Sequence, residues 1–357
     1  MTHSRTPLEA WVKAKIGLPA HRDLTRQILT KYQLEKLRST LDYVKCRSPF
    51  YRRHFATHNP ASVHGLQDLA RWPLTTADDL RSDPLAFLCV SQSAVERVVT
   101  LPARSPEVRP RRLFFTTADL ELAVDFFHHG FSTLVAPQQR MLVLMPCRQP
   151  HSVGDLLSRG LARLGVHVIA HGPMQSAEAV VDAVLRNQID CLVGVPSEMA
   201  ALARYPGSGR IPPGQIRSIW LGTQNTLRSA AEEIGRFWGC PVLQHYGAAE
   251  MCPGGGVECT ARDGFHLREA DLLIEIVAPC TPRPVDDGSY GEVLVTTLTR
   301  EAMPLVRYRT GHLAAVMPEP CPCGSALRRM TSICPNPREP LMLKGVYTNG
   351  PHSCSRL

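Results

Sequence analysis

The chain has 357 residues and a mass of 39.4 kDa, which favours two domains or one large α/β body with additions. Its 44% of apolar and 20% of charged residues are ordinary for a globular protein and argue against wholesale disorder. The 40 basic and 32 acidic residues leave a net charge of +8, which favours polyanionic partners such as nucleotides, coenzymes, nucleic acid or anionic membranes.

The N-terminus contains no targeting signal that we can identify. Residues 1–5 precede no apolar stretch, and no apolar run of the chain approaches the ~18 residues of a membrane span. We therefore expect a cytoplasmic protein with no signal peptide, no transmembrane helix and no membrane partner. The 12 cysteines are then expected to be mostly buried, reduced thiols and not a disulfide framework.

Residues 1–90 are expected to be helical. Apolar residues recur at helical spacing over 34–44, with charged residues on the opposite face. Pro49 is expected to end that helix, because the residue before a proline is driven out of the α region. Shorter helices are predicted at 67–71 and after Thr76, whose hydroxyl suits an N-cap.

Residues 91–255 are expected to form an α/β core in which short apolar strands alternate with helices. The strands are predicted at 95–101, 141–145, 166–169, 191–195, 216–221 and 241–243, and the helices at 120–131, 153–164, 177–186, 198–204 and 229–238. Such alternation predicts mostly parallel sheets flanked by helices on both faces. Ligands of such sheets bind beyond the carboxyl ends of the strands.

Residues 256–332 are expected to form a small β-rich subdomain. Apolar strands at 272–277 and 291–297 are separated by a turn-rich stretch at 282–289, which predicts an antiparallel hairpin with a long loop. The predicted fold class is therefore α/β, with a large N-terminal part and this smaller β-rich part.

Two segments carry residue types that suit nucleotide chemistry. Tyr246-Gly247-Ala248-Ala249-Glu250 follows a predicted strand, where an aromatic ring can stack on a base and a carboxylate can hold Mg²⁺ on phosphates; the alternative is a structural turn. Arg307-Tyr308-Arg309-Thr310-Gly311-His312 follows the last long strand, and its arginines can contact phosphate or carboxylate. The alternative there is an edge strand with solvated arginines.

Six motifs occur in order between about residue 30 and about residue 347. They are Ser48-Pro49-Phe50-Tyr51-Arg52, Tyr246-Gly247-x-x-Glu250, Gly254-Gly255-Gly256-Val257-Glu258-Cys259, His266-Leu267-Arg268-Glu269-Ala270-Asp271, Gly291-Glu292-Val293 and Pro304-Leu305-x-Arg307-Tyr308-Arg309-Thr310-Gly311. Together they resemble the phenylacetate–CoA ligase family of the adenylate-forming, or AMP-binding, superfamily. The resemblance implies a large N-terminal adenylate-forming domain. It also implies that 333–357 is the remnant of a hinge, with the small C-terminal domain expected to be absent.

The resemblance implies a two-step ligase reaction on a small carboxylic acid, aromatic in this family. With ATP and Mg²⁺ the acid forms an acyl-adenylate and pyrophosphate, and the thiolate of coenzyme A then displaces AMP. Because an anionic carboxylate must approach an anionic phosphate, such catalysis rests on positioning and electrostatic stabilisation. The implied nucleotide-binding residues are Tyr246 beside the adenine, the backbone of Gly247 and Ala248, and Arg309. The implied catalytic residue is Glu250, which would help to hold Mg²⁺.

Departures from the family pattern predict impaired turnover. Segment 103–111 stands where the family carries a glycine- and hydroxyl-rich phosphate loop that ends in Pro-Lys, yet it has no glycine, two prolines and Glu107. Arg111 replaces only the charge of the lysine. His312 replaces an aspartate that accepts from both ribose hydroxyls, and a neutral histidine offers one acceptor. Ala249 replaces a threonine. The alternatives are a non-catalytic or truncated remnant, or a coenzyme-adenylylating synthetase of the same family.

Cys259, His266, Cys321 and Cys323 are a candidate zinc-binding set. Three thiolates and an imidazole suit tetrahedral Zn²⁺, and the glycine after Cys323 opens a turn that lets two sulfur atoms face one ion. Some members of the resembling family carry a structural zinc at matching positions. The alternative is a group of buried free thiols.

Other partners are less well supported by the sequence. No basic stripe interleaved with aromatic residues and no groove-reading helix is apparent, so a nucleic-acid partner is disfavoured. A homo-oligomer is left open.

Overall fold

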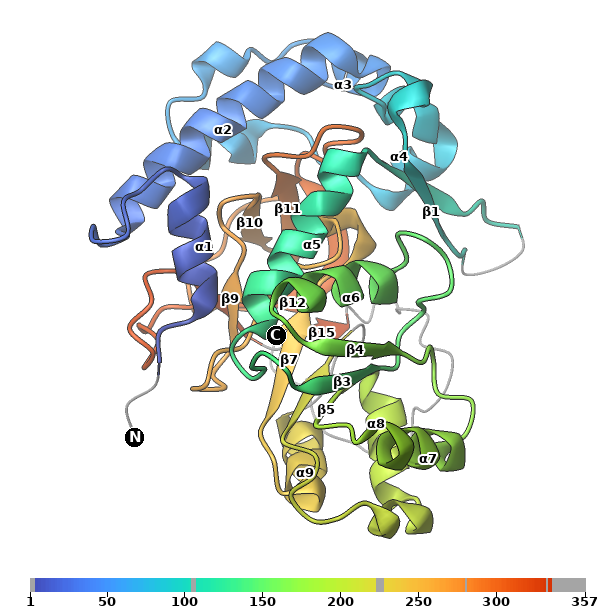
Figure 1. Ribbon diagram of the computed structural model, residues 1–357. Helices are drawn as coiled ribbons and strands as arrows, with labels where there is room; N and C mark the ends of the chain where they lie inside the picture. Colours follow the sequence, from blue (N-terminus) through green and yellow to red (C-terminus); the bar gives the residue numbers. More distant parts are fainter. Residues whose placement is uncertain (1–3, 104–106, 223–227, 280, 332, 336–357) are drawn as a thin grey trace.

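The N-terminal region is helical, as predicted. The computed structural model describes residues 4–103, 107–222, 228–279, 281–331 and 333–335. Its first helices are α1 (Pro7–Lys15), α2 (Arg26–Arg47), α3 (Pro49–His54) and α4 (Ala77–Ser82). Short 3₁₀ helices lie before α4 at Pro60–Ser62 and Leu66–Arg71 and after it at Pro84–Phe87 and Gln92–Ala94. In Figure 1, α2, α3 and α4 arch over one end of the molecule. The predicted helix end is confirmed, because Ser48 terminates α2 and its Oγ accepts from Tyr51 N to cap α3.

A nine-stranded sheet forms the centre, in the order β13-β14-β9-β8-β7-β6-β5-β3-β4. The strand bounds are β3 (Arg140–Val143), β4 (His167–Ala170), β5 (Cys191–Gly194), β6 (Ser218–Leu221), β7 (Val242–Tyr246), β8 (Gly256–Val257), β9 (Phe265–Leu267), β13 (Val316–Met317) and β14 (Arg329–Met330). Strands β3 to β7 are parallel, as predicted. The sheet continues across residue 255 into the antiparallel strands β8, β9, β14 and β13.

Helices cover both faces of the parallel strands. The helices are α5 (Thr117–Phe131), α6 (Val153–Arg163), α7 (Ala177–Asn187), α8 (Pro196–Arg204) and α9 (Arg228–Trp238). Alternate residues of a strand point to opposite faces. Met141 therefore packs in one core with Leu157 of α6, while Leu142 packs in a second core with Val181 of α7. Figure 1 shows α5 and α6 on one side of these strands and α7 to α9 on the other.

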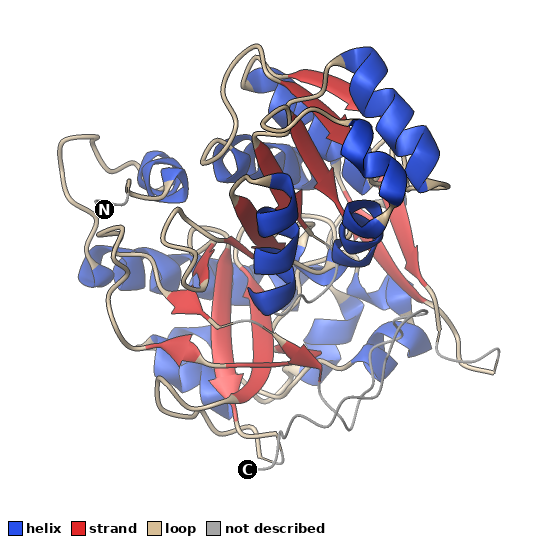
Figure 2. Cartoon of the chain, turned by 90° about the horizontal axis from the view of Figure 1, so that it is seen from below, coloured by secondary structure: helices blue, strands red, loops and turns tan. Residues whose placement is uncertain are grey.

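A four-stranded antiparallel sheet completes the fold, in the order β10-β11-β12-β15. Its strands are β10 (Leu272–Val277), β11 (Gly291–Thr297), β12 (Tyr308–Ala314) and β15 (Cys334–Pro335), so the predicted hairpin is confirmed with its bounds. A separate ribbon pairs β1 (Arg97–Leu101) with β2 (Arg111–Phe115). Figure 2 shows the strands in distinct groups with helices around them, which agrees with the predicted α/β class. Among the described residues, no helix is both long and apolar enough to span a bilayer.

Candidate functional site

The predicted nucleotide segment leaves the main sheet at the carboxyl end of β7. Tyr246 is the last residue of that strand, and Glu250 lies in the short 3₁₀ helix Ala249–Met251. The turn between them requires glycine, since a Cβ on Gly247 would lie 2.7 Å from the backbone N of Gly254. Gly254 has a φ of +124°, a conformation that other residues rarely adopt. The backbone therefore folds back tightly and presents Tyr246 and Glu250 at one edge.

The Glu250 carboxylate lies in a cluster of side chains from three separate elements. Arg111 Nη1, at the start of β2, donates to Glu250 Oε1 at 2.6 Å. Tyr308 Oη, at the start of β12, donates to the same oxygen at 3.2 Å and accepts from Arg111. Burial and the nearby Glu250 carboxylate raise the pKa of Tyr308 well above its ordinary value, so its hydroxyl stays protonated and can donate.

Arg300 fixes the backbone beneath this cluster. Its Nη1 donates to the carbonyl of Glu250 and its Nη2 to the carbonyl of Phe114, both at 3.0 Å. The guanidinium carbon lies 4.2 Å from the centre of the Phe115 ring. Arg300 therefore ties the helix that holds Glu250 to the strand that holds Arg111. The sequence did not identify Arg300 as a site residue. Its hydrogen-bond partners lie 50 and 186 residues away, and no motif near Arg300 indicates them.

Tyr246 and His312 contact each other across the same edge. The Tyr246 hydroxyl lies 3.1 Å from His312 Nδ1, and the two rings meet edge to face at 5.8 Å. Burial lowers the pKa of His312, so the neutral imidazole is favoured. A neutral ring accepts at one nitrogen, and Nδ1 can accept from Tyr246 while Nε2 carries the proton.

The two arginines beside Tyr308 have different surroundings. Arg309 donates from Nε and Nη2 to both carboxylate oxygens of Glu292, at 2.6 to 3.1 Å. Successive residues of a strand point to opposite faces, so Arg309 does not join the Glu250 cluster. Arg307 is fully buried and pairs with Glu275. The structure thus brings Tyr246, Glu250, Tyr308 and His312 to one edge, with the backbone of Gly247 and the half-buried Ala248 between them. It leaves Arg309 in a separate ion pair.

The surroundings of Glu250 do not suit a Mg²⁺ ion bound at Oε1. Mg²⁺ requires oxygen ligands at about 2.0–2.1 Å in near-octahedral geometry. Here the oxygen already accepts from Arg111 and Tyr308, and a guanidinium repels a divalent cation. Binding of Mg²⁺ by Glu250 stays a prediction, and the contacts of Glu250 with Arg111 and Tyr308 argue against it. Residues 104–106 of the expected phosphate loop and 336–357 of the expected hinge lie outside the described residues.

The four candidate zinc ligands come together in one buried cluster. Their ligand atoms all lie within 4.8 Å of one another, with Cys259 Sγ 3.6 Å from Cys321 Sγ and Cys323 Sγ 3.4 Å from His266 Nε2. Tetrahedral zinc with Zn–S bonds of about 2.3 Å places its sulfur ligands about 3.8 Å apart, so the set fits this ion. A hydrogen bond from Cys259 and the neighbouring His266 lower the pKa of the Cys323 thiol, which favours a thiolate.

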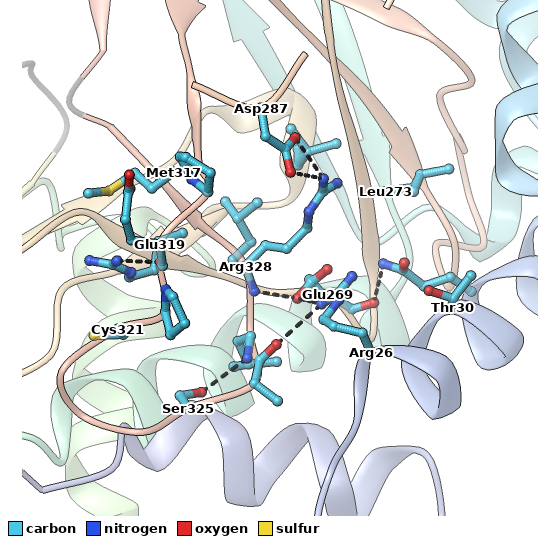
Figure 3. A pocket seen from close by; sticks show the side chains of 18 of the residues that line it. Arg26, Thr30, Glu269, Leu273, Asp287, Met317, Glu319, Cys321, Ser325 and Arg328 are labelled. Atoms are coloured by element: carbon cyan, nitrogen blue, oxygen red, sulfur yellow. Dashed lines mark hydrogen bonds and ion pairs between the residues drawn. The ribbon is translucent and has the colours of Figure 1, made fainter. Parts of the chain in front are cut away.

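A pocket of about 520 Å³ lies beside this cluster, between α2 and the loop that carries Cys321. Figure 3 shows its charged side chains bonded to one another. Arg26 pairs with Glu269 at 2.6 Å, and Arg328 pairs with Asp287 at 2.8 Å. These contacts hold the lining together, and the pocket is separate from the edge that carries Glu250.

Comparison with solved structures shows the fold. No family model matches the sequence. A 2-hydroxyisobutyryl-CoA ligase in its postadenylation state aligns with a TM-score of 0.79 at 19% identity, over 92% of this chain and 73% of that chain. An amide bond synthetase from Marinactinospora thermotolerans aligns with a TM-score of 0.52 at 17% identity, over 68% of this chain and 49% of that chain. The fold is therefore that of adenylate-forming ligases.

Comparison of sequences is more specific. The phenylacetate-coenzyme A ligase of Thermus thermophilus is 30% identical over 337 residues, which cover 92% of this chain and 75% of the relative. The phenylacetate-coenzyme A ligase of Escherichia coli is 31% identical over 340 residues, which cover 89% of this chain and 73% of the relative. Because these alignments span both chains so extensively, the protein belongs to the phenylacetate–CoA ligase family.

Proposed function

We propose that this chain is an acid–CoA ligase that activates a small aromatic carboxylic acid with ATP and transfers it to coenzyme A, at a reduced rate. Membership of the family supports the reaction class and implies the use of ATP, Mg²⁺ and coenzyme A. The observation that carries the proposal is that the Tyr246–His312 contact and the Glu250 carboxylate lie at the same edge, at the carboxyl end of β7. Ligands of α/β sheets bind at such ends.

The residues at this edge suit the binding of an adenine nucleotide. Tyr246, which is 5% exposed, would border the base at the end of β7, and the backbone of Gly247 and Ala248 would line the nucleotide. Arg111 supplies the cation nearest to Glu250, which offsets the repulsion between the carboxylate of the acid and the phosphate it must approach. We assign acyl-adenylate formation to this edge.

The reduced rate follows from two features of the same edge. The neutral His312 offers one acceptor nitrogen, and Tyr246 lies within hydrogen-bonding distance of it, so it cannot accept from two ribose hydroxyls. Segment 103–111 has no glycine, two prolines and the acidic Glu107, a composition unlike that of the loops whose backbone N–H groups wrap phosphates. Both features weaken binding of ATP and of the transition state.

The proposal is tested by acid-dependent release of pyrophosphate. Purified protein is incubated with ATP, Mg²⁺ and a panel of acids that includes phenylacetate and benzoate, beside a Tyr246→Ala variant prepared identically. We expect turnover below about 1 s⁻¹, against a typical enzyme rate of about 10 s⁻¹, and its loss in the variant. Turnover at the typical rate would contradict the impairment. Nucleotide binding without acid-dependent pyrophosphate release would favour a non-catalytic remnant of the fold. Pyrophosphate release that depends on a deazaflavin coenzyme in place of an acid would favour a coenzyme-adenylylating synthetase.

We also propose a structural Zn²⁺ ion held by Cys259, His266, Cys321 and Cys323. The burial of all four side chains and their spacing support this assignment. Bound there, the ion would cross-link the loop of Cys321 and Cys323 to the antiparallel part of the main sheet. Elemental analysis should find one zinc per chain in the wild type and less than half an equivalent in Cys259→Ser. The exposed Cys46 supplies the control, since Cys46→Ser should retain the metal. A wild-type protein without zinc would contradict the assignment.

A further inference from the structure

The Glu250 carboxylate is neutralised by a cation that belongs to the chain itself. Arg111 Nη1 lies 2.6 Å from Glu250 Oε1, and the Tyr308 hydroxyl bonds to both groups. The carboxylate is 9% exposed and the Arg111 side chain 22%, so water screens this pair less than it screens a surface pair. A site that contains one negative and one positive charge has little attraction for a divalent metal ion.

Arg111 is held in place by the backbone on which it lies. It is the first residue of β2 and pairs with Leu101, the last residue of β1, in an antiparallel ribbon. The next residue, Arg112, points to the opposite face and is exposed. The chain thus places two arginines side by side, of which one reaches Glu250 and the other faces solvent.

We propose that the Arg111 guanidinium replaces a divalent metal ion at Glu250 and contacts the phosphate nearest the ribose of a bound adenine nucleotide. A guanidinium is planar, stays charged and presents its N–H groups in a geometry that matches phosphate oxygens. Glu250 then orients Arg111 and does not bind metal. This inference rests on the proposed function only in taking an adenine nucleotide as the ligand.

The test measures the affinity for AMP by calorimetry, in EDTA and in excess Mg²⁺. AMP is the suitable probe because its single phosphate binds Mg²⁺ weakly. An effect of Mg²⁺ on the affinity for AMP therefore indicates that a protein side chain binds the metal. The wild type should bind AMP equally in both conditions. In EDTA, the affinity of Arg111→Ala for AMP should be about tenfold lower than that of the wild type, as expected for the loss of one charge-assisted hydrogen bond. Mg²⁺ should restore much of that loss, because Glu250 is then exposed to metal.

Three further variants make the test specific. Arg111→Ala combined with Glu250→Gln should lose the rescue by Mg²⁺, because the metal ligand is gone. Arg112→Ala removes the same charge one residue away and should change the affinity by less than about twofold. Arg111→Lys keeps a cation at the site and should bind AMP without metal even if Arg111→Ala fails to fold.

The inference is overturned if the affinity of the wild type for AMP depends on Mg²⁺ and the affinity of Glu250→Gln does not. It is also overturned if Arg111→Ala and Arg112→Ala behave alike, or if no protein binds AMP in either condition. The outcome is separate from that of the ligase proposal. Acid-dependent pyrophosphate release can occur with a metal at Glu250, and AMP can bind through Arg111 in a protein that does not turn over.

Discussion

Replacing the buried Arg307 with methionine should destabilise the whole fold. Its guanidinium donates to the carbonyls of Ala70, Trp72 and Pro282, and it pairs with Glu275 at 3.2 Å. Arg307 itself is 0% exposed and has a φ of +48°, which non-glycine residues seldom adopt. The side chain thus joins the N-terminal helical region to the four-stranded sheet directly before Tyr308.

The size of the destabilisation follows from the buried polar groups that Arg307→Met leaves without a partner. Three carbonyls lose a donor, and the carboxylate of Glu275, 13% exposed, loses its partner. Breaking a buried ion pair costs about 3–5 kcal/mol, and the separate losses within one network do not add. An unfolding entropy of about 2.1 cal/mol/K per residue corresponds to roughly 0.75 kcal/mol/K for 357 residues. The expected fall in Tm is therefore about 4–7 °C.

Thermal unfolding followed by circular dichroism measures this fall. The matched control is Arg328→Met, because Arg328 forms a surface pair with Asp287, 38% and 44% exposed. Such pairs contribute about 0–1 kcal/mol, so the control should melt within about 1 °C of the wild type. Equal melting temperatures for the two variants would refute the reasoning, since burial would then not decide the cost of losing the arginine.

Three further outcomes are expected. Burial raises the pKa of Glu258 to about 7, so the stability that it contributes is complete below its ordinary pKa and is lost as the pH rises through 7. The Tm of Glu258→Gln minus that of the wild type should therefore grow between pH 5 and pH 8, and a constant difference would argue against a shifted pKa. Gly254→Ala should lower the Tm, because its Cβ would lie 2.2 Å from the Phe126 ring, whereas Gly209→Ala has no heavy atom within 4 Å and should not. If Zn²⁺ is bound as proposed, chelation should lower the Tm of the wild type but not that of Cys259→Ser, and equal effects on both would place the metal elsewhere.

The parallel core and the hairpin could be predicted because their signals are local. The strands β10 and β11 are rich in apolar, β-branched residues and are separated by a turn-rich stretch, and their predicted bounds match the structure. The two-residue strands β8, β13 and β14 carry too few residues for a period to appear. The continuation of the main sheet beyond β7 was therefore not foreseen.

The candidate site shows a similar division. Tyr246, Glu250 and the Cys/His set were identified from motif and spacing. Tyr246 and Glu250 lie at and just after the end of β7, and the ligand atoms of the Cys/His set lie within 4.8 Å of one another. The Arg111 contact with Glu250 joins residues 139 positions apart, and no pattern near either residue indicates it. Long-range pairs of this kind depend on how β2 and β12 converge on the end of β7. The resemblance to the family located the residues, whereas the fold determined their partners.

The central claim is that this chain joins a carboxylic acid to coenzyme A. The most direct test incubates the protein with ATP, Mg²⁺, coenzyme A and phenylacetate, and then measures the acyl-CoA thioester and AMP by mass spectrometry. We predict that both products form in equal amounts, slowly, only when the acid is present, and not with Tyr246→Ala. If the folded protein binds AMP yet forms no thioester with any acid of the panel, the claim is contradicted.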